Sequence, residues 1–237
     1  VGEPLLLAAH RGGWRRPAGG WRDDARISGG QVFAHATGAV EQVVALVDAP
    51  VESVGATAVK RVWHHVSNAD HTSLQLRFAN GAQAQITVSG LTVWPRPALE
   101  VLGTTGSLIL EADPAGQEAA GPAAGFAGFG GLAGFGGLGG FGGLGGLGAG
   151  GDAAGGVLQV TADGVWTRYP IPRSLPDGAA LGGGGSTAAF YGALADLLVS
   201  GWPLPAELGV AAARPVVSVL AAAATSVAAG GESVTPL

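Results

Sequence analysis

The sequence contains no cysteine and no methionine, and charged residues make up only 12% of its 237 residues. Without cysteine the chain can form no disulfide, no thiolate nucleophile and no zinc–thiolate site. An ordinary soluble domain has roughly 25% charged residues, so the surface of this protein must carry few charges. The lack of cysteine fits a reducing compartment, and we expect a cytoplasmic protein.

Basic patches and long apolar segments are also scarce. The net charge is −5, and no run of lysine or arginine exceeds two residues. Proteins that bind nucleic acid usually carry a basic surface, so we expect no nucleic-acid partner. The longest apolar stretch, 216–229, is mostly alanine and falls short of the ~20 strongly apolar residues of a membrane span. We therefore expect no membrane partner.

Common catalytic and nucleotide-binding motifs are missing. No GxGxxG follows a strand and opens a helix, and there is no GxxxxGK[ST], no HExxH and no GxSxG between a strand and a helix. Glycine-rich strings between 116 and 151 match GxGxxG only because half of these residues are glycine. No cofactor-binding residues are therefore predicted in this chain.

Glycine is abundant, with 44 residues, and much of it lies in GFGG, GLGG and GLAG units. Ordering such a backbone costs more conformational entropy than a few phenylalanine and leucine side chains return. We predict a flexible insertion over residues 115–156 within a single domain of residues 1–237. An assembly segment is the alternative, because phenylalanine recurs there at short intervals.

Alternation of apolar and polar residues predicts strands. Leu74, Leu76 and Phe78 would share one face, and Asn80-Gly81 supplies a turn to a second alternating segment, so we expect a hairpin with one buried side. Similar patterns predict further strands at 51–62, 98–102, 107–111, 157–160 and 165–169.

Helical spacing occurs in three segments. The first segment places apolar residues along one side of a helix that ends before Pro50, and the second covers residues 190–198. The third begins at Pro205, and we expect Pro215 to bend or split it. Together the elements predict an α+β fold: an open, antiparallel-rich mixed sheet with helices packed on one face. The first stripe consists of Phe33, Ala36, Val40, Val43, Val44 and Val47.

Several separated segments occur in the order and spacing of one known family. They include VGEP at 1–4, WRD at 21–23, SGGQ at 28–31 before a helix, LRFANG at 76–81 and VLGTTGSLI at 101–109. With the Phe190-Tyr191 helix, they resemble the C-terminal substrate domain of the Gfo/Idh/MocA oxidoreductases. The resemblance covers nearly the whole chain apart from the glycine-rich insertion.

The resemblance implies that a preceding Rossmann domain, missing from this chain, binds NAD or NADP. It implies a substrate-binding and oligomerisation domain of an oxidoreductase acting on CH–OH groups of a small-molecule sugar or polyol, and a homo-oligomer formed through the sheet. The family's lysine in a Glu-Lys-Pro motif is absent, since Lys60 is the only lysine. We expect the isolated chain to be inactive.

The family's helix after GGQ usually carries a histidine and an acidic residue. Here Gly38 stands at the histidine position and Glu41 at the acidic one, while His35 lies three residues before Gly38. The catalytic candidates implied are His35, whose imidazole would reach toward the vacated position, and Glu41. The alternative for His35 is a polar residue at the start of a helix.

Relatives line the sugar pocket with aromatic and polar side chains, which implies substrate-binding roles for Trp14, Trp21, Arg22 and Gln31. Aromatic faces suit the C–H faces of a sugar ring, and arginine suits hydroxyls or a carboxylate. Loop packing is an equal alternative for Trp14, Trp21 and Arg22, and helix entry for Gln31.

The segment from Trp63 to His71 is rich in histidine, but alternation would place His64 and His65 on opposite faces of a strand, so no metal site is predicted.

The sequence also leaves a second function open. With Gly38 in place of the family histidine, the chain could be a degenerate, non-catalytic binding or self-association module.

Overall fold

The computed structural model describes residues 1–14, 16–94, 96–112, 156–162, 164–171, 195–201 and 210–237. The expected insertion lies outside these residues apart from Gly156, which begins a strand. Of the helix predicted over 190–198, only the part from residue 195 is described, and it is helical up to residue 200. The predicted helix start at Pro205 also lies outside.

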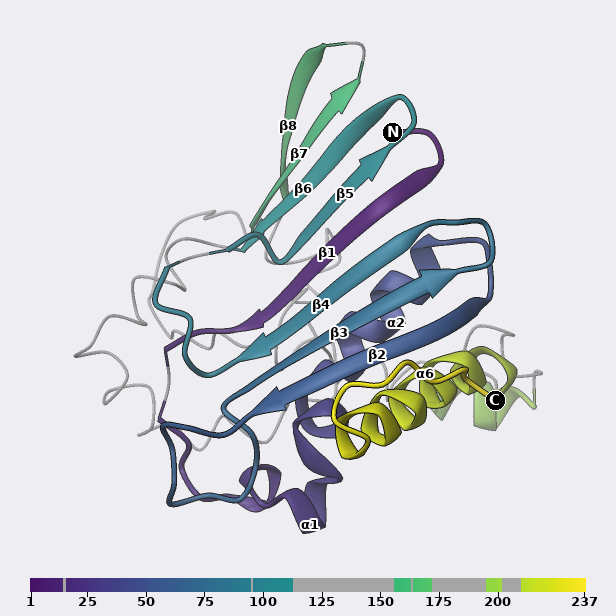
Figure 1. Ribbon diagram of the computed structural model, residues 1–237. Coiled ribbons are helices and arrows are strands. Elements are labelled where there is room, and N and C mark those ends of the chain that lie inside the picture. The colour runs from purple at the N-terminus through teal and green to yellow at the C-terminus, as the bar shows by residue number, and fades with distance from the viewer. Residues whose placement is uncertain (15, 95, 113–155, 163, 172–194, 202–209) are drawn as a thin grey trace.

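In the described ranges, eight strands form one sheet in the order β2-β3-β4-β1-β5-β6-β7-β8 (Figure 1). Within it, β1 and β4 are parallel and every other neighbouring pair is antiparallel. The predicted α+β class with a mixed, antiparallel-rich sheet is therefore confirmed. The strands are β1 (Pro4–Gly12), β2 (Val51–Val59), β3 (His71–Phe78), β4 (Gln83–Ser89), β5 (Leu99–Gly103), β6 (Gly106–Ala112), β7 (Gly156–Ala162) and β8 (Val165–Ile171).

The predicted hairpins are confirmed. Strands β3 and β4 pair through the Asn80-Gly81 turn, where Gly81 has φ 86°, and β5–β6 and β7–β8 pair as expected. The strand predicted to reach Val62 ends at Val59, because the backbone amides of Arg61, Val62 and Trp63 turn toward the Asp70 carboxylate. Strand β1 was not predicted, because both of its faces carry apolar residues and its sequence shows no alternation.

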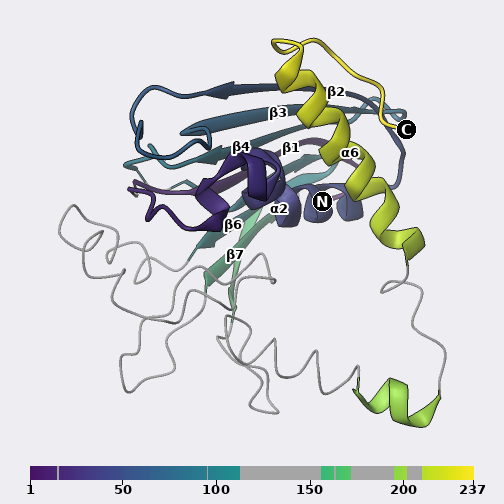
Figure 2. The same cartoon turned by 90° about the horizontal axis from the view of Figure 1, so that it is seen from below.

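The helices lie on one face of the sheet, as predicted (Figure 2). A 3-10 turn η1 (Trp21–Asp23) and a short helix α1 (Ala25–Ser28) precede a π-helix η2 (Val32–Ala36), which continues into α2 (Thr37–Leu46). The predicted stripe was wrong at Phe33, which is 37% exposed, whereas Val32 is buried at 5%. Because a π-helix has a wider turn than an α-helix, the buried stripe changes register at this point.

Pro215 was predicted to bend or split this helix, and the split was wrong, because helix α6 (Val210–Ala228) runs unbroken through Pro215. Proline removes the hydrogen bond to the carbonyl four residues earlier, but Ala211 is exposed and its carbonyl can be hydrated. Among the residues that the structure describes, α6 is the one helix that is long and apolar enough to cross a membrane, by length and composition alone. It packs against β2 instead, and the Ser226 hydroxyl accepts a hydrogen bond from the Ala56 amide at 2.8 Å.

The core lies between the helices and the strands that they cover. Along β1, Leu7 and Ala9 point toward the helices and are 0% and 3% exposed, while Leu6, Ala8 and His10 point the other way. Helices η2, α2 and α6 pack on β1, β2 and β4, and no helix in the described ranges packs on the opposite face of the sheet. We refer to these as the covered face and the open face.

Candidate functional site

Two loops meet beyond the sheet edge at which β1, β2 and β4 end (Figure 1). The first comprises residues 13–31 and the second residues 60–70. Asn68 joins them: its side-chain amide donates to the Arg22 carbonyl at 2.6 Å, and its backbone amide donates to the Asp23 carbonyl at 3.0 Å. The strands β1 and β4 are parallel, so their carboxyl ends open on the same edge, where side chains from loops can converge.

The second loop is organised around Asp70, whose side chain is only 1% exposed. Its carboxylate accepts hydrogen bonds from the amides of Arg61, Val62 and Trp63 at 2.6, 2.7 and 3.2 Å, and lies 3.3 Å from the Lys60 ammonium. Burial alone would raise the pKa of Asp70, but these amides and Lys60 hold its pKa below the usual value.

Lys60, the one lysine of the chain, closes this loop from its other side. Its ammonium donates to the carbonyls of Trp63 and Asn68 at 2.7 and 2.6 Å, in addition to Asp70. One carboxylate and one ammonium thus fix the backbone on both sides of Trp63. The loop is held as a rigid support for the aromatic side chains that it carries.

An aromatic wall, formed by Trp14, Trp63 and His65, spans the two loops. The ring centroids of Trp14 and Trp63 are 5.5 Å apart at 59°, and the His65 ring lies edge-on to Trp63 at 6.4 Å. His65 Nε2 is 3.0 Å from the Pro17 carbonyl, which ties the wall to the first loop. Trp14 is 41% exposed, so the wall presents an aromatic surface to solvent.

Trp21 and Arg22 form a separate pair in η1. The Arg22 guanidinium lies 4.9 Å from the centroid of the Trp21 ring, a cation–π contact, and Trp21 is 54% exposed. The Asn68 hydrogen bond to the Arg22 carbonyl fixes this pair to the same loop that carries Trp63. Trp14, Trp21 and Arg22 therefore lie on one loop system, and their roles in substrate binding stay predictions.

Two glycines shape the entry to η2. Gly29 and Gly30 have φ of 77° and 87°, in the left-handed region that other residues rarely adopt. The Phe33 side chain also packs over Gly29, where an added Cβ would lie 3.2 Å from the ring. Gln31 follows and is buried, with only 8% of it exposed. Its Oε1 accepts a hydrogen bond from the Thr72 hydroxyl at 2.6 Å. This bond ties the start of the helix to β3.

The two catalytic candidates lie on successive parts of this helix. His35 is half-buried within the π-helix η2, and Glu41 is exposed on α2. The wider π turn changes how side chains before and after it share a face, so the α-helical spacing that relates His35 to Gly38 does not hold across their boundary. A proton-transfer role for His35 and Glu41 stays a prediction.

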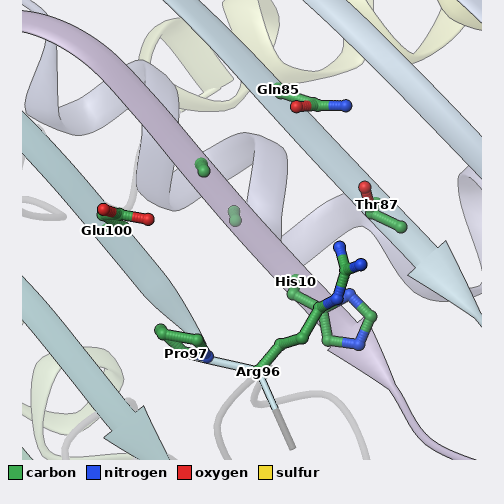
Figure 3. A pocket seen from close by; sticks show the side chains of 8 residues that line it. His10, Gln85, Thr87, Arg96, Pro97 and Glu100 are labelled. Atoms are coloured by element: carbon green, nitrogen blue, oxygen red, sulfur yellow. The ribbon is translucent and has the colours of Figure 1, made fainter. Parts of the chain in front are cut away.

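Arginine 11, at the end of β1, was missed by sequence analysis. Its guanidinium donates to the carbonyls of His10 and Ala98 at 2.9 and 2.8 Å and to Gln42 Oε1 at 2.7 Å, so it joins β1 to α2. The missed strand explains the omission, because only the strand places Arg11 on the covered face. On the other side of β1, His10 points into a pocket on the open face (Figure 3).

Neither a metal nor a dinucleotide site is formed by the described ranges. They contain no group of three or more histidine, aspartate or glutamate side chains that could hold a metal ion. The two parallel strands there, β1 and β4, are followed by long loops and not by a glycine-rich turn that opens a helix. The described residues therefore do not fit a nicotinamide dinucleotide.

Comparison with known families and structures gives the following similarities. Residues 1–109 match the model of the GFO/IDH/MocA C-terminal domain, a range that runs from β1 into β6 and includes both loops of the site. The sequence has no match among curated proteins.

Three solved structures share the fold. An aldose-aldose oxidoreductase from Caulobacter crescentus, solved with glycerol, has TM-score 0.65 at 14% identity, over 99% of this chain and 56% of that one. An NAD-binding protein from Listeria innocua has TM-score 0.60 at 17% identity, over 99% of this chain and 56% of that one. A 3-ketoreductase from Actinomadura kijaniata, in complex with NADP, has TM-score 0.60 at 16% identity, over 97% of this chain and 55% of that one. The chain spans little more than half the length of these proteins.

Proposed function

We propose that the chain, whose residues 1–109 match the model of the GFO/IDH/MocA C-terminal domain, is the substrate-binding and oligomerisation domain of an NAD(P)-dependent oxidoreductase that acts on a sugar or polyol. NAD or NADP would be bound by a separate domain and would accept or supply the hydride. The two loops at the edge of the sheet would bind and orient the substrate. By itself the chain would not catalyse the reaction.

The aromatic wall is the observation that carries this proposal. Sugars expose C–H groups on the faces of their rings, and aromatic side chains bind such faces without hydrogen bonds. Trp14 and Trp63 provide this surface from two loops that Asn68 and Asp70 hold in place. A support that is already ordered lowers the entropy cost of binding, which favours a binding role over loop packing alone.

Calorimetric titration of the chain with glucose and with myo-inositol tests the proposal. We expect saturable binding of at least one of them, weakened about tenfold or more in Trp63→Ala, since stacked aromatic residues contribute strongly to recognition. Trp166→Ala is the matched control, because Trp166 is 60% exposed on β8, far from the site in the sheet order. Equal loss of affinity in both variants, or none in either, contradicts the proposal.

The role of His35 is tested separately, by sugar-dependent reduction of NAD(P) in the full protein. If His35 transfers the proton, His35→Gln lowers kcat about 10²-fold or more with little change in KM. Unchanged turnover removes His35 from the mechanism. Glu41→Gln, measured in the same way, tests the acidic candidate.

The alternative function, a non-catalytic self-association module, is favoured by Gly38 at the family's histidine position and by the uncovered face of the sheet. Both functions include a homo-oligomer through the sheet. On the open face, Leu6 and Leu102 lie directly opposite each other and are 44% and 40% exposed, an apolar pair for a second copy to cover. Light scattering at micromolar concentration tests this, and a clean monomer contradicts it.

A further inference from the structure

A small pocket of about 110 Å³ interrupts the open face of the sheet near the end of β1. It exists because Ala8 is small and stands between two longer side chains, Gln85 on β4 and Glu100 on β5, which are its direct neighbours in the two registers. Neighbouring strands are about 4.8 Å apart, so the gap between these two side chains spans about 10 Å. We call this the Ala8 notch.

His10 closes one end of the Ala8 notch (Figure 3). Both of its ring nitrogens are shielded from solvent and have no hydrogen-bond partner in the described part of the chain. A buried polar atom without a partner is costly, and a bound ligand or water would satisfy it. Thr87 and Arg96 flank the ring, so donors surround the same space.

Positive charge gathers around this histidine. Burial, followed by the charges of Arg96, Arg11 and His71, lowers the pKa of His10 to about 4. Glu100 is the one carboxylate that lines the notch, and neither it nor Arg96 takes part in an ion pair among the described side chains. The notch thus offers a guanidinium and an imidazole at one end and a carboxylate acceptor on β5, beside Ala8.

We propose that the Ala8 notch binds a small hydroxycarboxylate, with its carboxylate against Arg96 and His10 and its hydroxyl donating to Glu100. Arginine prefers carboxylates because its donors match the two oxygens. Glu100 disfavours a simple anion but accepts a hydrogen bond from a hydroxyl. This site lies on the face of the sheet opposite the helices and is separate from the aromatic wall of the proposed function.

The probe is glycolate, and its binding is monitored through the ring proton signal of His10 in NMR spectra. The chain has five histidines, and the signal is assigned by its loss in His10→Gln. We expect a saturable shift with glycolate, and a rise of the His10 pKa by about one unit, which corresponds to tenfold tighter binding to the protonated ring. Acetate, which lacks the hydroxyl, should bind more weakly.

Two variants separate the notch from general charge effects. Arg96→Gln should weaken glycolate binding roughly tenfold or more, as expected for a lost hydrogen bond to a charged group. Arg77→Gln is the control, because Arg77 lies on β3 and does not line the notch. No saturable shift, binding of inorganic phosphate but not glycolate, or equal weakening in both variants contradicts the inference.

The proposed oligomer uses the same face, so light scattering is recorded on the same samples. A His10 shift that follows glycolate concentration at a constant oligomeric state supports the notch. A shift that follows a change of oligomeric state instead contradicts it. The result does not depend on sugar binding at the aromatic wall, so the notch and the proposed function can fail independently.

Discussion

The covered and open faces of the sheet are built from the same strands but carry different side chains. Each of β1, β3 and β4 contributes fully buried apolar residues to the covered face, among them Leu7, Leu74 and Ile86 at 0% exposure. The open face of β3 and β4 carries histidine, glutamine, serine, threonine and arginine, and β1 adds His10 to the apolar Leu6 and Ala8. The covered face fixes the fold, while the open face and the loops at its edge are free to carry function.

The largest effect should follow from a cavity in the covered face. Phe78 is 0% exposed at the end of β3, so Phe78→Ala should lower the free energy of unfolding by about 3–5 kcal/mol. Gln75→Ala, on the open face of the same strand, should change it by less than about 0.5 kcal/mol. Denaturant unfolding measures both. Similar losses in the two variants would mean that the faces do not differ as described.

A somewhat smaller loss is expected where the second loop joins the sheet. Asp70→Asn removes the ion pair with Lys60 and weakens the amide hydrogen bonds, which should cost about 2–4 kcal/mol. Asp48→Asn, an exposed carboxylate, is the control. Unfolding curves at neutral pH give the free energy of unfolding of both variants. Equal stability of Asp70→Asn and Asp48→Asn would contradict the role given to Asp70.

The pH dependence of this loop has a defined sign. The pKa of Asp70 is lower in the folded protein than in the unfolded chain. Its stabilisation is therefore fully present above the unfolded pKa of about 3.9 and is lost as pH falls through the folded pKa. Acid unfolding should be less steep in Asp70→Asn than in the unchanged protein. An identical acid transition would contradict the expected shift.

On the open face, a charge at the apolar pair should break self-association without unfolding the chain. Leu6→Glu should weaken the homo-oligomer at least about tenfold, because a charge would be buried at the contact. Val217→Glu, on an exposed position of α6, should leave it unchanged. Sedimentation measures the dissociation constant. An oligomer that survives Leu6→Glu must form elsewhere.

The last prediction concerns His10, whose effect on stability appears only below about pH 6.5. Its folded pKa of about 4 lies below the unfolded value of about 6.5, so the folded state resists protonation. Stability should be constant above about pH 6.5 and fall between 6.5 and 4 as the unfolded chain takes up the proton. His10→Gln should flatten this interval, whereas Gln85→Ala should not. Urea unfolding across this pH range measures how stability changes with pH. The same pH dependence in His10→Gln as in the unchanged protein would contradict the prediction.

Sequence alone predicted most of the sheet, because one face of each hairpin is apolar and the other polar. Strand β1 escaped, since Leu6 and Ala8 on its open face are as apolar as Leu7 and Ala9 on its covered face. The helix was predicted, but its register was not, because nothing in the residues from Val32 to Ala36 marks a π turn.

The loop system was harder to predict than the sheet. Trp14, Trp21 and Arg22 were selected by resemblance, yet Trp63, Asn68 and Asp70 hold their loop in place. Asp70 stood next to three histidines in a segment considered for metal binding, and only the folded backbone reveals that three amides converge on its carboxylate. Hydrogen bonds to backbone groups leave no pattern in the sequence.

The central claim is that the aromatic wall at the edge of the sheet binds the substrate. The most direct measurement is an NMR titration with a sugar that follows the indole N–H signals of the six tryptophans. The account predicts that the Trp14 and Trp63 signals shift with one saturable affinity while that of Trp166 stays in place. Saturable binding that leaves Trp14 and Trp63 unshifted would contradict it.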